Sequence, residues 1–125
     1  MKDNKNISVM LTIGSIATAL GINQRTLRIY DSEGILSPKR SEKNRRYYTL
    51  EDLEKAKLIQ FLTRNLLLNL SGVKIVLAIL EQEKIKPENW ISYIEKIAQK
   101  ANITNKIQSE NILKADKRGR PLANS

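Results

Sequence analysis

Two glycines, Gly21 and Gly34, restrict the first third of the chain to short helices. Before Gly21, the apolar residues of TIGSIATAL recur three and four positions apart, which predicts a helix that begins after Thr12. Thr12 can cap this helix, and Gly21 can end it in a left-handed conformation. Asn23 is a good N-cap for a second helix over about 24–33, which Gly34 would end. Two short helices joined by a glycine-containing turn are typical of a helix-turn-helix.

The segment from Ser37 to Tyr48 is expected to form a small β-hairpin. It holds five basic residues and one acidic residue, and its polar SEKN stretch suits a loop between two short strands. The next residues, TLED, resemble a capping box in which Thr49 is the N-cap and Asp52 replaces the usual glutamate. A third helix is therefore expected from about Leu50 to Arg64.

A fourth helix with an unusually wide apolar face is expected after Ser71, its predicted cap. Ile75 and Ile79 widen a stripe that includes Val73 and Leu80, so this helix is expected to pack on two sides. Further along, Pro87 suits the first position of another helix. In that helix, four apolar residues follow the 4-3-4 spacing of a coiled-coil seam: Trp90, Ile94, Ile97 and Ala101.

Charge and composition narrow the class of partner. The 125 residues carry a net charge of +9, which favours a polyanion, either nucleic acid or an anionic membrane surface. No apolar run approaches the roughly 20 residues that span a bilayer, and the N-terminal residues do not resemble a secretion signal. We therefore expect a cytoplasmic, nucleoid-associated protein that has no membrane partner.

Catalysis is not expected from this composition. The chain has no cysteine and no histidine, so thiolate metal sites and the usual general base near neutral pH are missing. Paired carboxylates at Glu51/Asp52 and Glu81/Glu83 fall on helix caps or exposed faces and are interpreted as solvated charges. Neither a cofactor nor a metal is expected, and the chain is not expected to be an enzyme.

Binding residues are more abundant. The start of the second helix in a helix-turn-helix normally lies in the DNA major groove. Arginine suits the edge of guanine, and glutamine or asparagine suits adenine. A solvated helix face around a buried Leu27 is the alternative, but a second basic cluster at the distance of a wing favours DNA. The predicted reading residues are Asn23, Gln24, Arg25, Thr26 and Arg28.

These residues resemble the winged helix-turn-helix of the MerR family of bacterial transcription regulators. The family pattern runs from an Ile-Gly-x-x-Ala start, through Thr-Leu-Arg-x-Tyr-acidic-x-x-Gly and a proline, to Arg-x-Tyr and an acidic residue. The resemblance covers about residues 12–84 and implies a mainly α fold with a β-hairpin wing, followed by a C-terminal dimerisation helix. The matching residues are Ile13, Gly14, Ala17, Thr26, Leu27, Arg28, Tyr30, Asp31, Gly34, Pro38, Arg46, Tyr48 and Asp52.

The resemblance implies a homodimer joined by an antiparallel coiled coil of the last long helix, in the region 87–115. Trp90, Ile94, Ile97 and Ala101 would form its seam, the alternative being that this helix folds back on its own domain. We expect a sequence-specific regulator that binds double-stranded DNA at inverted repeats. The rival interpretations are a DNA-bending, excisionase-like protein and a protein-interaction module with a basic face. Backbone or groove contacts are expected from Tyr30, Lys39, Arg40, Arg45, Arg46 and Tyr48.

Within the family, the stretch Leu68–Leu80 resembles the heat-shock repressor (HspR) and glutamine-repressor (GlnR) branches, whose members lack metal-binding cysteines. Two departures stand out. Ile29 replaces a tyrosine of the family pattern, which removes a hydroxyl that could contact DNA. Leu67 replaces a glycine that is common between the third and fourth helices, so the conformation of that turn is not predicted.

The basic tail, 116–125, contains KRGRP, which matches the core of an AT-hook. In such hooks an extended Arg-Gly-Arg follows a narrow A·T minor groove, here Arg118, Gly119 and Arg120. A disordered basic tail that aids solubility is the alternative, and it is favoured because the match is only five residues long.

Overall fold

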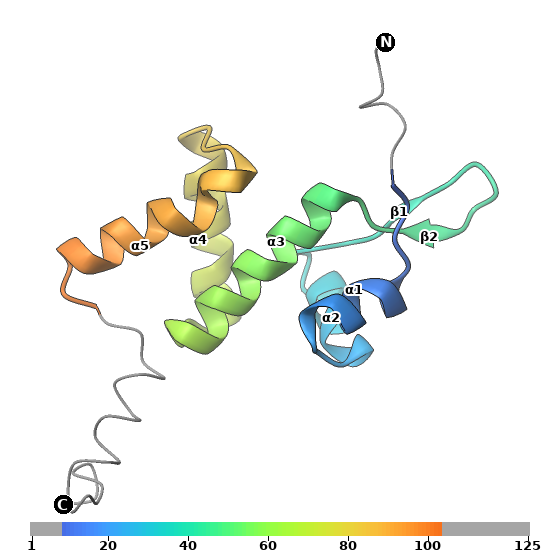
Figure 1. Ribbon diagram of the computed structural model, residues 1–125, viewed down its shortest axis with the longest axis horizontal. Helices are drawn as coiled ribbons and strands as arrows, with labels where there is room; N and C mark the ends of the chain where they lie inside the picture. The colour runs from blue at the N-terminus through green and yellow to red at the C-terminus, as the bar shows by residue number, and fades with distance from the viewer. Residues whose placement is uncertain (1–8, 104–125) are drawn as a thin grey trace, which may run out of the picture. The chain divides into compact units, whose positions relative to one another are not determined.

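The computed structural model describes residues 9–103 (Figure 1). This part of the chain is mainly helical with one antiparallel hairpin, which confirms the predicted fold class. The tail with Arg118, Gly119 and Arg120 lies outside the described residues. The elements in chain order are α1 (Ile13–Leu20), α2 (Gln24–Ser32), β1 (Lys39–Arg40), β2 (Arg46–Tyr47), α3 (Leu50–Gln60), η2 (Phe61–Asn65), α4 (Leu70–Gln82), η3 (Pro87–Asn89) and α5 (Trp90–Lys100).

Two compact units make up the chain. The N-terminal unit is Met1–Lys57 and the C-terminal unit is Leu58–Ser125, so the division falls within α3. The predicted domains 12–84 and 87–115 rest on the family resemblance rather than on compactness, and they stay a prediction. Their proposed boundary lies between the end of α4 at Gln82 and the start of η3 at Pro87.

The first two helices begin and end as their sequence predicts. The Thr12 side chain accepts the Ser15 N–H at the start of α1, and Gly21 ends the helix with φ 66°. Asn23 caps α2 by accepting the Arg25 N–H at 2.9 Å. After α2, Gly34 adopts φ 75°, a left-handed conformation that glycine reaches without a steric penalty.

The hairpin and the start of α3 are held together by local hydrogen bonds. β1 pairs antiparallel with β2. Next to β2, Tyr48 exchanges two backbone hydrogen bonds with Leu11, at 2.7 and 2.8 Å, so the segment that leads into α1 is tied to the hairpin. The predicted capping box is confirmed, because Asp52 accepts the Thr49 N–H and the Thr49 hydroxyl accepts the Asp52 N–H.

Apolar side chains from every element of the N-terminal unit's helix-turn-helix contribute to its core. Leu27 is fully buried on the inner face of α2, as the sequence predicts. Burial of these groups is the main favourable term in folding a small domain. The buried residues of this unit are Ile16, Ala17, Leu27, Tyr30, Ile35, Leu36, Tyr48, Asp52 and Ala56.

In the C-terminal unit, the end of the third helix differs from the prediction. The helix was expected to continue regularly to Arg64, but it widens into the π-helical turn η2, where the Leu66 N–H bonds to the Phe61 carbonyl. Leu67 then adopts φ 57°, so a leucine occupies the left-handed position that the family's glycine suits. The turn therefore forms in spite of the residue.

The predicted cap of the fourth helix was wrong by two residues. Asn69, not Ser71, is the N-cap of α4, and its side chain accepts the Gly72 N–H at 2.8 Å. The α4 helix buries Val73 and Leu80, but Ile75 is 62% exposed and Ile79 is also exposed. Within the described part of a single chain, α4 therefore does not bury the second apolar side that the sequence led us to expect.

The last described helix packs on its own unit along one stripe. Pro87 takes the predicted first position, but in the short 3-10 turn η3, after which α5 begins at Trp90. The Trp90 Nε1–H donates to the Ile85 carbonyl at 3.0 Å. Ile94 and Ala98, four residues apart, are buried, so this stripe is the inward face of α5.

Candidate nucleic-acid interface

The first turn of α2 presents polar side chains to the surface next to one buried residue. Gln24 and Arg25 are exposed and Thr26 is half-buried, while Leu27 fixes the helix in the core. The side-chain oxygen of Asn23 is occupied by the helix cap. Of the predicted reading residues, Asn23 therefore has the most evident structural role, because its carbonyl oxygen is already engaged.

Gln24 and Arg28 act as a pair along α2. The Arg28 Nη2 donates to the Gln24 Oε1 at 3.3 Å, the i, i+4 contact expected on one helix face. Gly14 of α1 faces this pair, because a Cβ built on it would lie 3.4 Å from the Gln24 Nε2. Ile29, at the position of the family's tyrosine, is exposed beside them.

The wing loop is shaped by short hydrogen bonds that leave basic side chains on the outside. Asn44 adopts φ 64° in the turn and its N–H donates to the Ser41 carbonyl at 2.8 Å. The Arg40 Nη1 donates to the Asn44 carbonyl at 3.0 Å, so this guanidinium partly braces the loop. Arg45 and Arg46 are exposed.

Lys39 has a structural contact that sequence reasoning missed. Its Nζ lies 2.9 and 3.0 Å from the two carboxylate oxygens of the buried Asp52. The pair joins β1 to the capping box of α3 across 13 positions of sequence, and no local signal indicates it. Its predicted contact with DNA stays a prediction.

The two tyrosines of the predicted set are buried rather than projecting. Tyr30 is 4% exposed and Tyr48 is 2% exposed. Burial raises the pKa of Tyr48 above its usual 10, and the nearby carboxylates of Asp31 and Asp52 raise it further. Arg46 and Arg28 act in the opposite direction. The phenol therefore stays protonated and can donate a hydrogen bond at any physiological pH.

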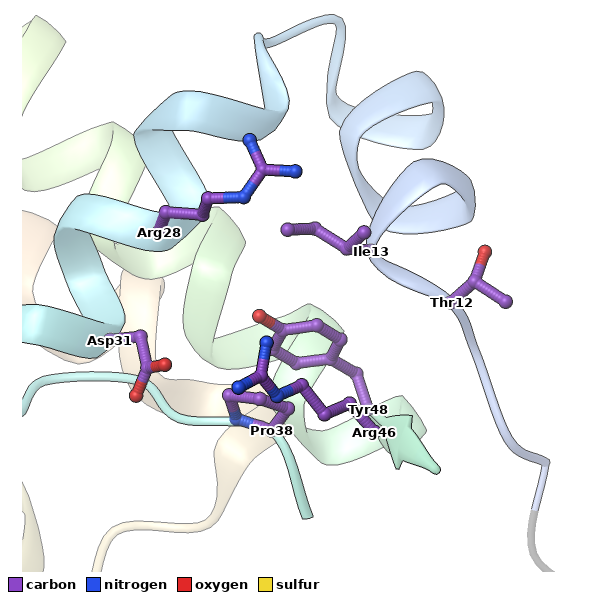
Figure 2. Close-up of a pocket in the computed structure, with 7 residues that line it drawn as sticks. All are labelled: Thr12, Ile13, Arg28, Asp31, Pro38, Arg46 and Tyr48. Atoms are coloured by element: carbon purple, nitrogen blue, oxygen red, sulfur yellow. The ribbon is translucent and has the colours of Figure 1, made fainter. Parts of the chain in front are cut away.

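A pocket of about 180 Å³ lies where α1, α2 and the wing meet. Figure 2 shows the guanidinium groups of Arg28 and Arg46 and the Tyr48 hydroxyl around one space, with the Asp31 carboxylate at its edge. The lining thus joins residues that are far apart in the chain. The complete lining is Thr12, Ile13, Arg28, Asp31, Pro38, Arg46 and Tyr48.

The predicted dimer seam is divided between two faces of α5. Ile94 is 8% exposed and Trp90 is half-buried, so both contribute to packing within the chain. Ile97 is 47% exposed, and Ala101 at the end of the helix is also exposed. The four residues therefore do not form one outward stripe, although their role in dimerisation stays a prediction.

Among residues 9–103 there is no group of three or more acidic, histidine or cysteine side chains placed to hold a metal ion. Within the same residues, no helix is long and apolar enough to cross a membrane.

Comparison with known proteins agrees with this geometry. Residues 11–79 match the family described as MerR HTH family regulatory protein. The chain is similar to the HTH-type transcriptional regulator GlnR of Bacillus anthracis, with 29% identity over 92 residues that cover 70% of each protein. The heat shock protein HspR of Streptomyces coelicolor is 35% identical over 69 residues, 54% of this chain and 46% of that protein.

A third relative is the homologue of the transcriptional regulator ZntR from Haemophilus influenzae. It is 33% identical over 87 residues, which cover 69% of this chain and 64% of that protein. No solved structure matches the chain. Because the family match spans more than half of the chain and includes both helices of the helix-turn-helix, the wing and α3, the protein belongs to the MerR family of helix-turn-helix transcription regulators.

Proposed function

We propose that the protein acts as a homodimer and regulates transcription by binding inverted-repeat operators in a sequence-specific manner. The observation that carries the proposal is that the exposed polar start of α2 and the arginines of the wing belong to one compact unit. In a helix-turn-helix the former would read base edges in the major groove. The wing would contact the backbone or the minor groove.

Uncompensated positive charge supports DNA as the partner. Within residues 9–103, Arg25, Arg45 and Arg46 take part in no ion pair, whereas Lys39 is neutralised by Asp52. Guanidinium groups suit both guanine and phosphate because they offer two parallel donors. We assign base reading to Gln24 and Arg25.

Exposed isoleucines in the C-terminal unit support a homodimer. Ile97 on α5 and Ile75 and Ile79 on α4 are all exposed in the single chain. Apolar surface of this kind commonly marks a protein interface. A two-fold dimer would present two copies of α2, so its operator should be an inverted repeat whose half-sites lie about one helical turn apart.

Mapping of genomic binding sites by the wild type and by Arg25→Ala tests the proposal. We expect the wild type to occupy inverted repeats near promoters and Arg25→Ala to lose this preference. Arg64→Ala is a matched control, because Arg64 is an exposed arginine of the C-terminal unit. Sites without sequence preference would instead indicate a DNA-bending, architectural protein, and the absence of sites would indicate a protein-interaction module.

A further inference from the structure

One position on the outward side of α2 is apolar. The exposed side chains of this helix are polar or charged except that of Ile29, which is 44% exposed. The other large apolar residues of the helix, Leu27 and Tyr30, are 0% and 4% exposed and form its inward side. Part of the Ile29 side chain therefore remains in water, where it is available for a contact outside the chain.

Ile29 is the neighbour of Arg25 on the helix surface. Four positions along an α-helix correspond to about 6 Å along the axis and to a rotation of only about 40°. Arg25 is exposed, and among residues 9–103 it takes part in no ion pair. Arg28, in contrast, donates to Gln24 along the adjacent strip of the helix. The arginine to which we assign base reading therefore has an apolar side chain next to it.

The Ile29 side chain is held in a defined place. Leu27 and Tyr30, on either side of it in sequence, anchor the helix in the core. At the end of the helix, the Ser32 hydroxyl donates to the Ile29 carbonyl at 3.1 Å. A β-branched residue in a helix has one strongly preferred rotamer, so it loses little conformational entropy when a ligand covers it.

The surroundings of Ile29 indicate what kind of ligand covers it. An apolar protein surface placed on Ile29 would also cover the charges of Arg25 and Arg28, which is costly. DNA supplies both a polyanion for the arginines and an apolar group for Ile29. Among the groups that base pairs present in the major groove, the C5 methyl of thymine is apolar, and the others are hydrogen-bond donors or acceptors.

We propose that Ile29 determines specificity by reading thymine through its C5 methyl group. The proposal rests on the proposed function, in which α2 lies in the major groove. Ile29 and Arg25 are about 6 Å apart along the helix, and base pairs are about 3.4 Å apart. The thymine therefore lies within about two base pairs of the base that Arg25 reads. Isoleucine lacks the hydroxyl of the tyrosine common at this position, so the contact is specific to the residue of this chain.

Deoxyuridine in place of thymine tests the contact, because it removes only the methyl group and keeps the base pair. We expect the replacement of one thymine in each half-site to weaken wild-type binding about fourfold, the ratio expected when one methyl-sized apolar group returns to water. The same replacement should not weaken Ile29→Ala further, because this variant has already lost the contact. Dissociation constants for operators with each thymine replaced in turn measure this coupling.

The variants are matched to separate the contact from folding. Ile29→Ala places a residue of higher helix propensity at an exposed position, so its melting temperature should stay close to that of the wild type. Ile29→Val keeps the branched Cβ, and its preference for thymine over deoxyuridine should fall between those of the wild type and Ile29→Ala. Leu50→Ala is the control, because Leu50 is an aliphatic residue that is 54% exposed outside α2. It should keep the wild-type preference.

The outcomes separate the thymine contact from the proposed function. If Arg25→Ala loses operator preference but no single deoxyuridine weakens the wild type more than Ile29→Ala, the contact is wrong and the function stands. If Ile29→Ala loses the same factor on thymine and deoxyuridine operators, the contact is also wrong, because Ile29 then acts without the methyl group.

A duplex of dA·dT and the same duplex of dA·dU extend the test to DNA without an operator. If genomic mapping finds no operator, the proposed function is wrong. Tighter binding of the dA·dT duplex by the wild type but not by Ile29→Ala would then still support the contact, and equal binding of both duplexes by the wild type would overturn it.

Discussion

Helix ends in the two units use different residues for one hydrogen-bond pattern, except after the π-helical turn η2, where the Leu68 N–H donates to the Leu62 carbonyl six positions earlier. In the N-terminal unit, α1 and α2 are followed by Gly21 and Gly34, both left-handed. The next residue in each case donates its N–H to a carbonyl five positions earlier, the Ile22 N–H to Ala17 being one example. Glycine adopts this conformation freely, so the local sequence agrees with the local structure.

The C-terminal unit places residues with side chains in the same conformation. Leu67, Lys84 and Asn102 have φ of 57°, 56° and 59°. Left-handed backbone costs a residue with a Cβ about 1–2 kcal/mol, with asparagine the most tolerant of the three. These helix ends are therefore imposed by packing, and stability gained elsewhere must offset their cost.

The two units also differ in the kind of side chain that they expose. The N-terminal unit exposes arginines such as Arg25 and Arg45, which form no ion pair within residues 9–103 and suit a polyanion. The C-terminal unit exposes Ile75, Ile79 and Ile97. Under the proposed function, the arginines of the first unit would meet DNA, and a second copy of the chain would cover the exposed isoleucines of the second unit.

The largest effect is expected from a charge placed on the exposed apolar surface of the C-terminal unit. Ile97→Asp should give monomers and abolish tight operator binding, because a buried, unpaired carboxylate costs several kcal/mol. Ile97 is preferred to Ile94 because Ile94 is buried within the chain, where an aspartate would also unfold the unit. Sedimentation measures the oligomeric state. Gln99→Asp, on an exposed position of α5, is the control; persistent dimers of Ile97→Asp would move the interface to α4.

The next largest effect is expected from the loss of an exposed arginine of the N-terminal unit. Arg25→Ala should weaken operator binding by about 1–3 kcal/mol and relax the preference at one base position per half-site. Binding to a panel of operators with single base changes measures both effects. Equal losses on operator and random DNA would make Arg25 a phosphate contact instead.

A smaller loss is expected at the wing. Arg46→Ala should lower affinity on all sequences and make the salt dependence of binding shallower by about one unit, because one fewer counterion is released. Titrations at several salt concentrations give the slope. An unchanged slope would indicate that Arg46 supports the hairpin instead. Lys39 supports the hairpin in this way through its ion pair with Asp52.

The smallest predicted effect concerns the helix ends themselves. Leu67→Gly should raise the free energy of unfolding by about 1 kcal/mol, because the left-handed conformation becomes unstrained and Leu67 is half-exposed. Gly21→Ala should lower it by a similar amount. Chemical denaturation measures both. A destabilised Leu67→Gly would show that the leucine side chain contributes more through contacts than its backbone costs.

How far the sequence predicts the structure depends on the distance over which each feature acts. The caps at Thr12 and Asn23 and the box formed by Thr49 and Asp52 each join atoms within three residues, and all were predicted correctly. The cap at Asn69 was missed because Ser71, two residues later, is an equally good capping residue. Neighbouring polar residues compete at a helix start, and only packing of the following turn selects one.

The sequence by itself determined the two glycine-ended helices, the basic hairpin and the resemblance that pointed to the family, because these depend on residue types at short, regular spacings. Only the tertiary structure decided that Lys39 pairs with Asp52 and that Tyr48 is buried with its hydroxyl in a pocket. The tertiary structure also decided that, of the apolar residues of α5, Ile94 is buried and Ile97 is exposed. These features join groups from different elements, and their energies depend on distances that no local pattern encodes.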